Sequence, residues 1–393
     1  MKFDISAAFV LPEDSEQATL VGRVWRPDVE GPSVVAARGA ELIDISAATP
    51  TMRDLLETPL PAAVAHDIAG EPLGLLADVL ANTPREQRDS RKPWLLAPTD
   101  LQAIKAAGVT FAVSMLERVI EEKARGTSEQ AAALRAEIGG LIGDDLSHLK
   151  PGSAEAMELK KLLIARGMWS QYLEVGIGPD AEIFTKAPPM AAVGHLAEIG
   201  VYPHSHWNNP EPEVVVAVSS AGAIVGASLG NDVNLRDFEG RSALLLGKAK
   251  DNNASAAIGP FIRLFDRHFS VDDVASADVR LTVDGEDGYH LDGGSAMHKI
   301  SRSPQELVAA TIGAHHQYPD GVVLYLGTMF APIDDRDTKG QGFTHKTGDI
   351  VTISSPKLGR LSNRVTATDK AEPWTFGTAA LMHNLARRGL LQR

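Results

Sequence analysis

Residues 211–232 read EPEVVVAVSSAGAIVGASLGND, and this stretch decides how the chain folds around its candidate chemistry. Positions 214–218 form a run rich in β-branched valine, positions 224–229 form a second apolar run, and Ser219–Gly222 supply turn residues between them. Two such runs joined by a short turn predict an antiparallel β-hairpin. Facing positions in a hairpin add up to a nearly constant number, so a turn centred near residue 221 sets the register of the pair.

The two open ends of this hairpin carry three carboxylates. The predicted register puts Glu211 almost opposite Asp232, while Glu213, two residues along the same strand, points to the same face as Glu211. Three carboxylates at one point would repel each other, and a hard divalent cation would relieve that repulsion. Oxygen-only ligands suit Mg²⁺, with Mn²⁺ or Ca²⁺ as alternatives. The other interpretation is that the three acids are solvated residues at strand ends.

Polar segments elsewhere in the chain are candidates for the rim of the same site. Residues 231–237 (NDVNLRD) follow the second strand and form either a site rim or the capped start of a helix. Lys250 is either a surface group or, if it is buried beside a divalent cation, a base whose ammonium form is disfavoured near neutral pH. Gly327 and Thr328 follow an apolar strand and form either an ordinary turn or a cradle for a carboxylate.

The composition excludes several classes of function. A formal net charge of −13 argues against a nucleic-acid partner, because phosphate binding needs a basic surface. The absence of cysteine excludes disulfides, thiol catalysis and cysteinyl metal sites. No apolar run approaches the roughly 18 residues of a membrane span, and the N-terminus lacks a signal-peptide pattern. We therefore expect a cytoplasmic protein that has no membrane partner.

The chain divides by composition into a small and a large part. With 393 residues it is long enough for a main domain and a smaller one. We predict a small N-terminal mixed domain over 1–100, which ends in a polar, linker-like stretch at 83–93. The catalytic domain is predicted over 101–393. Its segment from about 113 to 170 is rich in Ala, Leu, Glu, Lys and Arg with helical periodicity, which predicts a helical insert.

The order and spacing of these motifs resemble the fumarylacetoacetate hydrolase family over roughly residues 100–393. The resemblance implies an α+β fold built around a mixed β-sheet roll, with Mg²⁺ or a similar ion. Members of that family act on 2-oxo acids, whose carboxylate and keto oxygens chelate the metal, and chelation stabilises an enolate. The implied metal ligands are Glu211, Glu213 and Asp232, and the implied substrate-binding residues are Thr328, Gly327 and Arg236, with Lys250 beside the substrate.

One stretch departs from the family pattern. Family hydrolases carry Gly-x-Asn-Tyr-x-x-His-x-x-Glu, whose His-Glu pair activates water, whereas residues 108–117 read GVTFAVSMLE. Glu117 is therefore present, but Ser114 stands where the histidine would be, and a serine cannot take a proton from water at neutral pH without a base. The departure disfavours hydrolysis of a C–C bond and leaves Ser114 as a substrate-binding candidate. Glu117 is a catalytic candidate, or a lid residue carried by the helical insert.

The chain as a whole, including its N-terminal part, resembles the family's 2-keto-3-deoxy-D-pentonate dehydratase branch. This implies metal-dependent dehydration of 2-keto-3-deoxy-D-xylonate or D-arabinonate to 2,5-dioxopentanoate through a metal-stabilised enolate. Lys250 and Glu182 would serve as base and acid in either order, unless Glu182 is an ordinary strand-edge carboxylate. The segments that carry this resemblance are 108–122, 169–175, 181–186, 207–213, 231–258, 316–321 and 342–346.

Two other functions fit the same residues. The first is a hydrolase of acylpyruvate-like diketo acids, which Ser114 disfavours. The second is a non-catalytic protein that binds a sugar acid beside a structural Ca²⁺ ion. In every case the expected partner is a small molecule, and the family resemblance adds a homodimer or homotetramer.

Overall fold

The computed structural model describes residues 2–124, 149–165, 167, 169–338 and 342–391. Eleven of the strands in these residues form one large sheet. They are β1 (Leu20–Arg26), β2 (Gly31–Arg38), β3 (Glu41–Asp44), β4 (Glu71–Leu75), β5 (Trp94–Leu96), β6 (Ala103–Gly108), β7 (Glu182–Ala187), β10 (Pro212–Val218), β11 (Ile224–Asp232), β13 (Ala256–Leu264) and β16 (Val322–Tyr325). Their order is β4-β3-β2-β1-β13-β11-β10-β16-β6-β7, and β5 pairs with β1.

A second sheet packs on the first and encloses the main core. Its order is β15-β14-β17-β18-β8, and a separate two-stranded ladder joins β9 to β12. Valines and leucines from β10 and β16 meet apolar side chains from β14 and β17, and each such side chain stabilises the fold by about 1.5–3 kcal/mol when buried. These strands are β8 (Glu198–Val201), β9 (Asn208–Asn209), β12 (Asn234–Leu235), β14 (Asp278–Asp284), β15 (His290–Ala296), β17 (Ile350–Ser355) and β18 (Gly359–Ala367).

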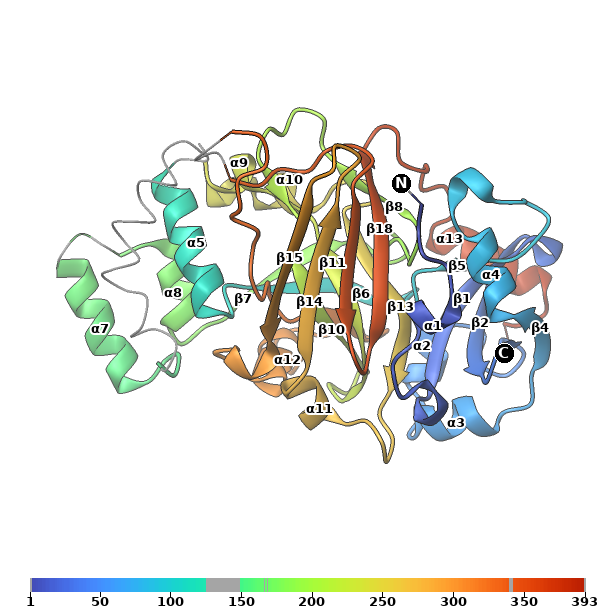
Figure 1. Cartoon of the computed structure of the whole chain (residues 1–393). Helices are drawn as coiled ribbons and strands as arrows, with labels where there is room; N and C mark the ends of the chain where they lie inside the picture. Colours follow the sequence, from blue (N-terminus) through green and yellow to red (C-terminus); the bar gives the residue numbers. More distant parts are fainter. Residues whose placement is uncertain (1, 125–148, 166, 168, 339–341, 392–393) are drawn as a thin grey trace.

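Helices cover the ends of the two sheets. Figure 1 shows α5, α7 and α8 together at one end of the molecule and the N-terminal strands at the opposite end. Across the part of the chain that the structure describes, every helix is too short or too polar to cross a membrane. The α-helices are α1 (Ala7–Val10), α2 (Met52–Leu56), α3 (Pro61–Asp67), α4 (Leu76–Asn82), α5 (Ala112–Lys123), α7 (Ala154–Ala165), α8 (Gln171–Ile177), α9 (Arg236–Glu239), α10 (Leu246–Lys250), α11 (Val271–Ala275), α12 (Pro304–Thr311) and α13 (Thr378–Arg387).

The predicted α+β fold and its central hairpin are confirmed. Strands β10 and β11 pair antiparallel with Pro212 opposite Asn231. Continuing that register puts Glu211 opposite Asp232, and the amide of Asp232 donates to the carbonyl oxygen of Glu211 over 3.1 Å. The turn closes at Gly222, whose φ of 81° lies in the left-handed region that favours glycine. The sequence therefore predicts the register that brings the carboxylates together.

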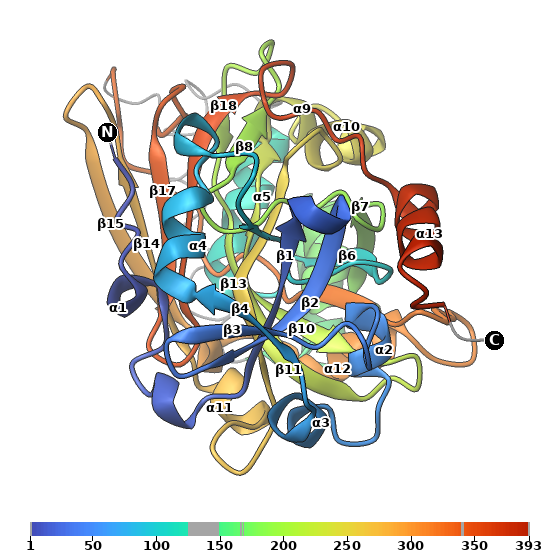
Figure 2. The same cartoon turned by 90° about the vertical axis from the view of Figure 1, so that its right-hand side faces the viewer.

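The N-terminal strands share the large sheet with the predicted catalytic domain. Strand β1 pairs with β13, and the C-terminal helix α13 returns to the N-terminal strands, where the Asn384 amide donates to the carbonyl of Val29 over 2.8 Å (Figure 2). The predicted linker at 83–93 is instead a folded loop, because the buried Asn82 amide donates to the carbonyls of Asp89, Lys92 and Pro93. A domain boundary near residue 100 stays a prediction.

Helices occupy both described parts of the predicted insert. Helix α5 begins just after β6, and α7 lies near the far end of the segment from 113 to 170. Buried apolar residues of α5, α7 and α8 form a cluster of their own, separate from the core between the sheets. The middle of the predicted insert, residues 125–148, lies outside the described residues.

Candidate metal centre

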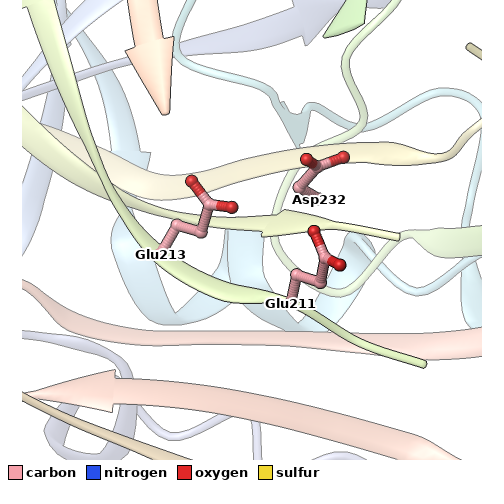
Figure 3. A group of neighbouring side chains, drawn as sticks. All are labelled: Glu211, Glu213 and Asp232. Carbon is pink, nitrogen blue, oxygen red and sulfur yellow. The ribbon is translucent and has the colours of Figure 1, made fainter. Parts of the chain in front are cut away.

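Three buried carboxylates meet at the open end of the β10–β11 hairpin. Glu211, Glu213 and Asp232 each offer an oxygen that lies within 4.8 Å of the other two, and all three side chains are buried. Figure 3 shows them converging from the two paired strands. Within the described residues this is the one group of His, Cys, Asp and Glu side chains with such spacing. A buried, all-oxygen set of donors fits a hard divalent cation such as Mg²⁺.

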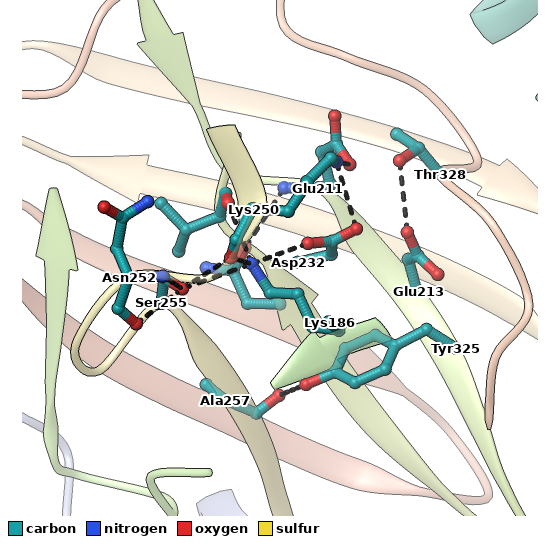
Figure 4. Close-up of polar contacts among 12 residues, drawn as sticks. Lys186, Glu211, Glu213, Asp232, Lys250, Asn252, Ser255, Ala257, Tyr325 and Thr328 are labelled. Carbon is teal, nitrogen blue, oxygen red and sulfur yellow. Dashed lines mark hydrogen bonds and ion pairs between the residues drawn. The ribbon is translucent and has the colours of Figure 1, made fainter. Parts of the chain in front are cut away.

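The segment after β16 holds Glu213. The Gly327 amide donates to Glu213 Oε2 over 2.7 Å. The Thr328 hydroxyl donates to Glu213 Oε1 over 3.1 Å (Figure 4). Gly327 has a φ of 100°, and a Cβ at this position would lie 2.0 Å from Thr110 Oγ1, so a larger residue does not fit. Both residues were predicted to bind a substrate carboxylate. In the structure they orient a carboxylate of the protein, and substrate binding by them stays a prediction.

Two lysines neutralise the other two acids. Lys186 Nζ lies 2.8 Å from Asp232 Oδ1, while Lys250 Nζ lies 3.0 Å from Asp232 Oδ2 and 2.5 Å from Glu211 Oε2 (Figure 4). Lys186 is fully buried and also donates to the carbonyls of Lys250 and Val233. Buried charges of this kind are tolerated only when they are paired, so these lysines are part of the architecture of the site.

The prediction that Lys250 acts as a base depends on a neighbouring cation and stays a prediction. Burial lowers the pKa of Lys250, but the carboxylates of Asp232 and Glu211 outweigh burial and raise that pKa well above its ordinary range. These two acids therefore favour the ammonium form of Lys250, which suits proton donation.

The pKa values of two of the acids shift in opposite directions. Burial, followed by the charges of Asp232 and Glu211, raises the pKa of Glu213 well above its ordinary value. Burial also raises the pKa of Glu211, but Arg118 and Lys250 outweigh it and lower that pKa to about 2. Clustered like charges that push one carboxyl toward its neutral form are what a cation at this point would relieve.

Glu182 lines the same cavity as two of the three carboxylates, Glu211 and Asp232. It is the first residue of β7, and burial followed by the charge of Glu239 raises its pKa to about 7. A carboxyl with a pKa near neutrality is suited to take and return protons. The cavity itself is small, about 10 Å³, and its lining is Ala107, Gly108, Val109, Arg118, Tyr172, Glu182, Phe184, Glu211, Asp232, Glu239, Lys250 and Thr328.

Among the predicted site residues whose side chains the structure describes, the lining of this cavity does not include Arg236, Glu117, Gly327 or Glu213. Arg236 is fully buried, lies over the Trp207 ring at 5.4 Å and donates to the carbonyl of Pro332 over 3.3 Å, so it anchors the segment after Thr328. Glu117 is buried in α5. Ser114 belongs to the same helix, but its side chain lies outside the described residues. The roles predicted for these residues stay predictions.

Sequence reasoning missed three charged residues of the site. Arg118 contacts Glu211 and lies 3.1 Å from Glu239, so it links α5 to α9 across the cavity. Lys186 could have been found, because it shares one face of β7 with Glu182 by the two-residue period of a strand. Arg118 and Glu239 carry no comparable signal, since only the tertiary fold brings their helices to the hairpin.

One protein-family model matches the part of the chain that contains the site. The model described as fumarylacetoacetate (FAA) hydrolase C-terminal matches residues 177–366, a range that contains all three carboxylates. A 2-dehydro-3-deoxy-D-arabinonate dehydratase of Saccharolobus solfataricus is 33% identical over 180 residues, which is 46% of this chain and 57% of the relative. A probable 2-keto-3-deoxyxylonate dehydratase of Haloferax volcanii is 32% identical over 199 residues, 51% of this chain and 65% of the relative. The matched regions thus span less than two thirds of both relatives.

Solved structures extend the likeness in fold to most of the chain. The apo form of a 2-keto-3-deoxy-D-arabinonate dehydratase superposes with a TM-score of 0.61 at 20% identity, covering 88% of this chain and 99% of that one. A second structure, described as that dehydratase complexed with magnesium and 2,5-dioxopentanoate, gives a TM-score of 0.60 at 20% identity, covering 88% of this chain and 99% of that one. At this identity the two structures establish a shared fold.

Proposed function

Residues 177–366 form a domain of the fumarylacetoacetate hydrolase family, as the motif spacing predicts, and from this premise we propose that the protein dehydrates a 2-keto-3-deoxy-D-pentonate to 2,5-dioxopentanoate. The two curated relatives carry names for arabinonate and xylonate substrates. In the D series these names describe one compound, because a keto group at C2 and a methylene at C3 leave C4 as the only stereocentre. The proposal therefore does not require a choice between the two names.

The observation that carries the proposal is one small cavity lined by two of the candidate metal ligands and by two candidate proton-transfer groups. Glu211 and Asp232 line it together with Lys250 and Glu182. Glu211, Glu213 and Asp232 would hold the cation, Mg²⁺ in the first instance, with Mn²⁺ or Ca²⁺ as alternatives. A divalent cation bound there would supply positive charge beside the 2-oxo group of a substrate, which makes the hydrogens on C3 more acidic.

The charge states of the two proton-transfer groups suggest their roles. Glu182, with its pKa raised to about 7 by burial and by Glu239, accepts the proton from C3. Lys250, held as an ammonium group, donates a proton to the C4 hydroxyl, which leaves as water. The electron pair of the C3–H bond forms the C3–C4 double bond as the C4–O bond breaks. A proton shift from C5 and tautomerisation of the resulting enol give the aldehyde, so the net reaction loses one water molecule.

A turnover assay with metal removal tests the proposed function. We expect the EDTA-treated protein to be inactive on 2-keto-3-deoxy-D-pentonate, and added Mg²⁺ to restore loss of that substrate. Pyruvate release from an acylpyruvate without dehydration of the pentonate would instead establish the hydrolase. Thermal stabilisation by Ca²⁺ without turnover of either substrate would establish the sugar-acid binding protein.

A substitution beside Glu182 tests whether its position matters. Gly108 faces Glu182 across the β6–β7 ladder, and a Cβ there would lie 1.9 Å from Glu182 Oε2. Gly108→Ala displaces this flexible carboxyl, so we expect kcat to fall about 10- to 100-fold at unchanged Mg²⁺ affinity. Gly313→Ala, at a position where an added Cβ meets nothing within 4 Å, is the matched control. If Gly108→Ala has the same kcat as the wild type, Glu182 takes no part in the mechanism.

The cellular setting and assembly of the protein stay predictions. We expect a cytoplasmic homodimer or homotetramer whose partner is a small-molecule sugar acid. The net charge of −13 supports the prediction that no nucleic acid binds, since phosphate groups would meet a surface of the same sign.

A further inference from the structure

Protein groups engage every carboxylate oxygen of the three candidate ligands. Glu213 accepts from Gly327 and Thr328, which are neutral donors. Glu211 and Asp232 instead face positive charge: Arg118 and Lys250 on Glu211, and Lys186 and Lys250 on Asp232. A neutral donor can share an oxygen with a metal ion, but a guanidinium or ammonium group repels the ion. Metal binding is therefore favoured when one of these three groups moves away from its carboxylate.

Lys186 and Lys250 are poorly suited to leave. Lys186 has no exposed surface, and its ammonium is tied to Val233, Lys250 and Ser255 besides Asp232. Both ion-pair partners described for Lys250, Glu211 and Asp232, belong to the ligand set itself. Moving Lys250 away from the acids would separate a buried ammonium group from both of its ion-pair partners, which is unfavourable.

Arg118 differs from both lysines in two ways. It comes from α5, outside the two sheets, and it has a carboxylate partner beyond the ligand set, Glu239, at 3.1 Å. It can therefore release Glu211 and keep a counter-charge. Its present position also fills the site, because the remaining space of about 10 Å³ holds no more than one water molecule. A five-carbon sugar acid needs that space.

We propose that Arg118 is an internal counter-ion that occupies Glu211 until a divalent cation displaces it onto Glu239. The inference rests on the proposed metal site and adds to it a competitor built into the chain. Because the ion has to displace Arg118 from Glu211, the metal affinity of the protein is lowered. When the ion binds, the guanidinium of Arg118 moves away from the cavity wall beside the ligands. Glu211 and Glu239 lie on either side of Arg118, so its guanidinium can move from one carboxylate to the other.

Metal affinity of the full chain tests the proposal with a definite sign. Mn²⁺ titrations followed by calorimetry compare the wild type with Arg118→Met and with Lys248→Met, which removes an exposed cation that lies over Tyr202. We expect Arg118→Met to bind Mn²⁺ at least about tenfold more tightly, because a positive charge a few ångströms from the ion is gone. Lys248→Met is expected to match the wild type. An affinity for Arg118→Met equal to or weaker than wild type overturns the proposal.

A crystal structure of the wild-type protein with Mn²⁺ provides a second test that needs no variant. We expect the guanidinium of Arg118 to contact Glu239 and to have left Glu211. A bound ion with Arg118 still on Glu211 contradicts the exchange while leaving the metal site in place. A wild-type protein that binds no Mn²⁺ in the titration overturns the metal site and this inference together, so the two failures are distinguishable.

Discussion

Replacing Glu213 by Gln is expected to abolish Mg²⁺ binding and to lower turnover by at least about 10³-fold, because the several kcal/mol of charge stabilisation supplied by a metal are lost. The fold should persist. Glutamine has the same shape, its amide oxygen can accept from Gly327, and its amide nitrogen can donate to Thr328. Loss of activity in this variant therefore reports on metal ligation and not on unfolding. Isothermal titration with Mg²⁺ and a steady-state assay measure the two effects separately.

The stability of the Glu213→Gln variant carries a further expectation with a definite sign. Burial and the neighbouring carboxylates raise the pKa of Glu213 well above the value of about 4.3 that it has in an unfolded chain. Below its unfolded pKa the carboxyl is protonated in both states and does not change the stability. As the pH rises toward its folded pKa, the unfolded chain loses this proton while the folded protein keeps it, so the EDTA-treated protein becomes less stable. The Tm of the variant minus that of the wild type should therefore grow with pH. A variant that binds Mg²⁺ with wild-type affinity would contradict the assignment of Glu213 as a ligand.

Replacing Glu182 by Gln is expected to lower kcat about 10²- to 10⁴-fold while the Mg²⁺ affinity stays within a few-fold of wild type. Glu182 shares the cavity with Glu211 and Asp232 but is not one of the three ligands. The variant thus separates proton transfer from metal binding. Glu198→Gln, a partly buried carboxylate on β8 that pairs with Arg85, is the matched control and should keep wild-type activity.

The pH dependence of the wild type supports or contradicts the assigned direction of proton transfer. If Glu182 is the base, kcat/KM rises with pH as its carboxyl ionises, with a midpoint near its pKa of about 7. The residual activity of Glu182→Gln should lack that rising limb. A profile that falls through the same range would make Glu182 the acid and would exchange its role with that of Lys250.

Local periodicity made the cluster of three carboxylates predictable from the sequence. The valine run and the turn at Ser219–Gly222 determine the register of one hairpin, and the two-residue period of a strand puts Glu211 and Glu213 on one face. Asp232 follows from the same register, because it lies across the ladder from Glu211. Information within about twenty residues was sufficient for this part of the site.

The counter-charge supplied by Arg118 depends on a contact between distant segments and could not be predicted. Arg118 reaches Glu211 across 93 positions of sequence, and no spacing rule connects α5 to the hairpin. The raised pKa of Lys250 has the same origin, since it follows from the carboxylates of Asp232 and Glu211, which the fold brings to the lysine. The folded loop at 83–93 likewise depends on one buried amide, that of Asn82, which composition does not reveal.

Product analysis across a panel of 2-keto-3-deoxy sugar acids tests the central claim most directly. The panel contains the D-pentonate, its L enantiomer at C4 and a hexonate, each incubated with the Mg²⁺-loaded protein and with the EDTA-treated protein. We predict Mg²⁺-dependent formation of 2,5-dioxopentanoate and water from the D-pentonate. Cleavage of that substrate to pyruvate and glycolaldehyde, or no turnover of it by protein that binds Mg²⁺, would contradict the account.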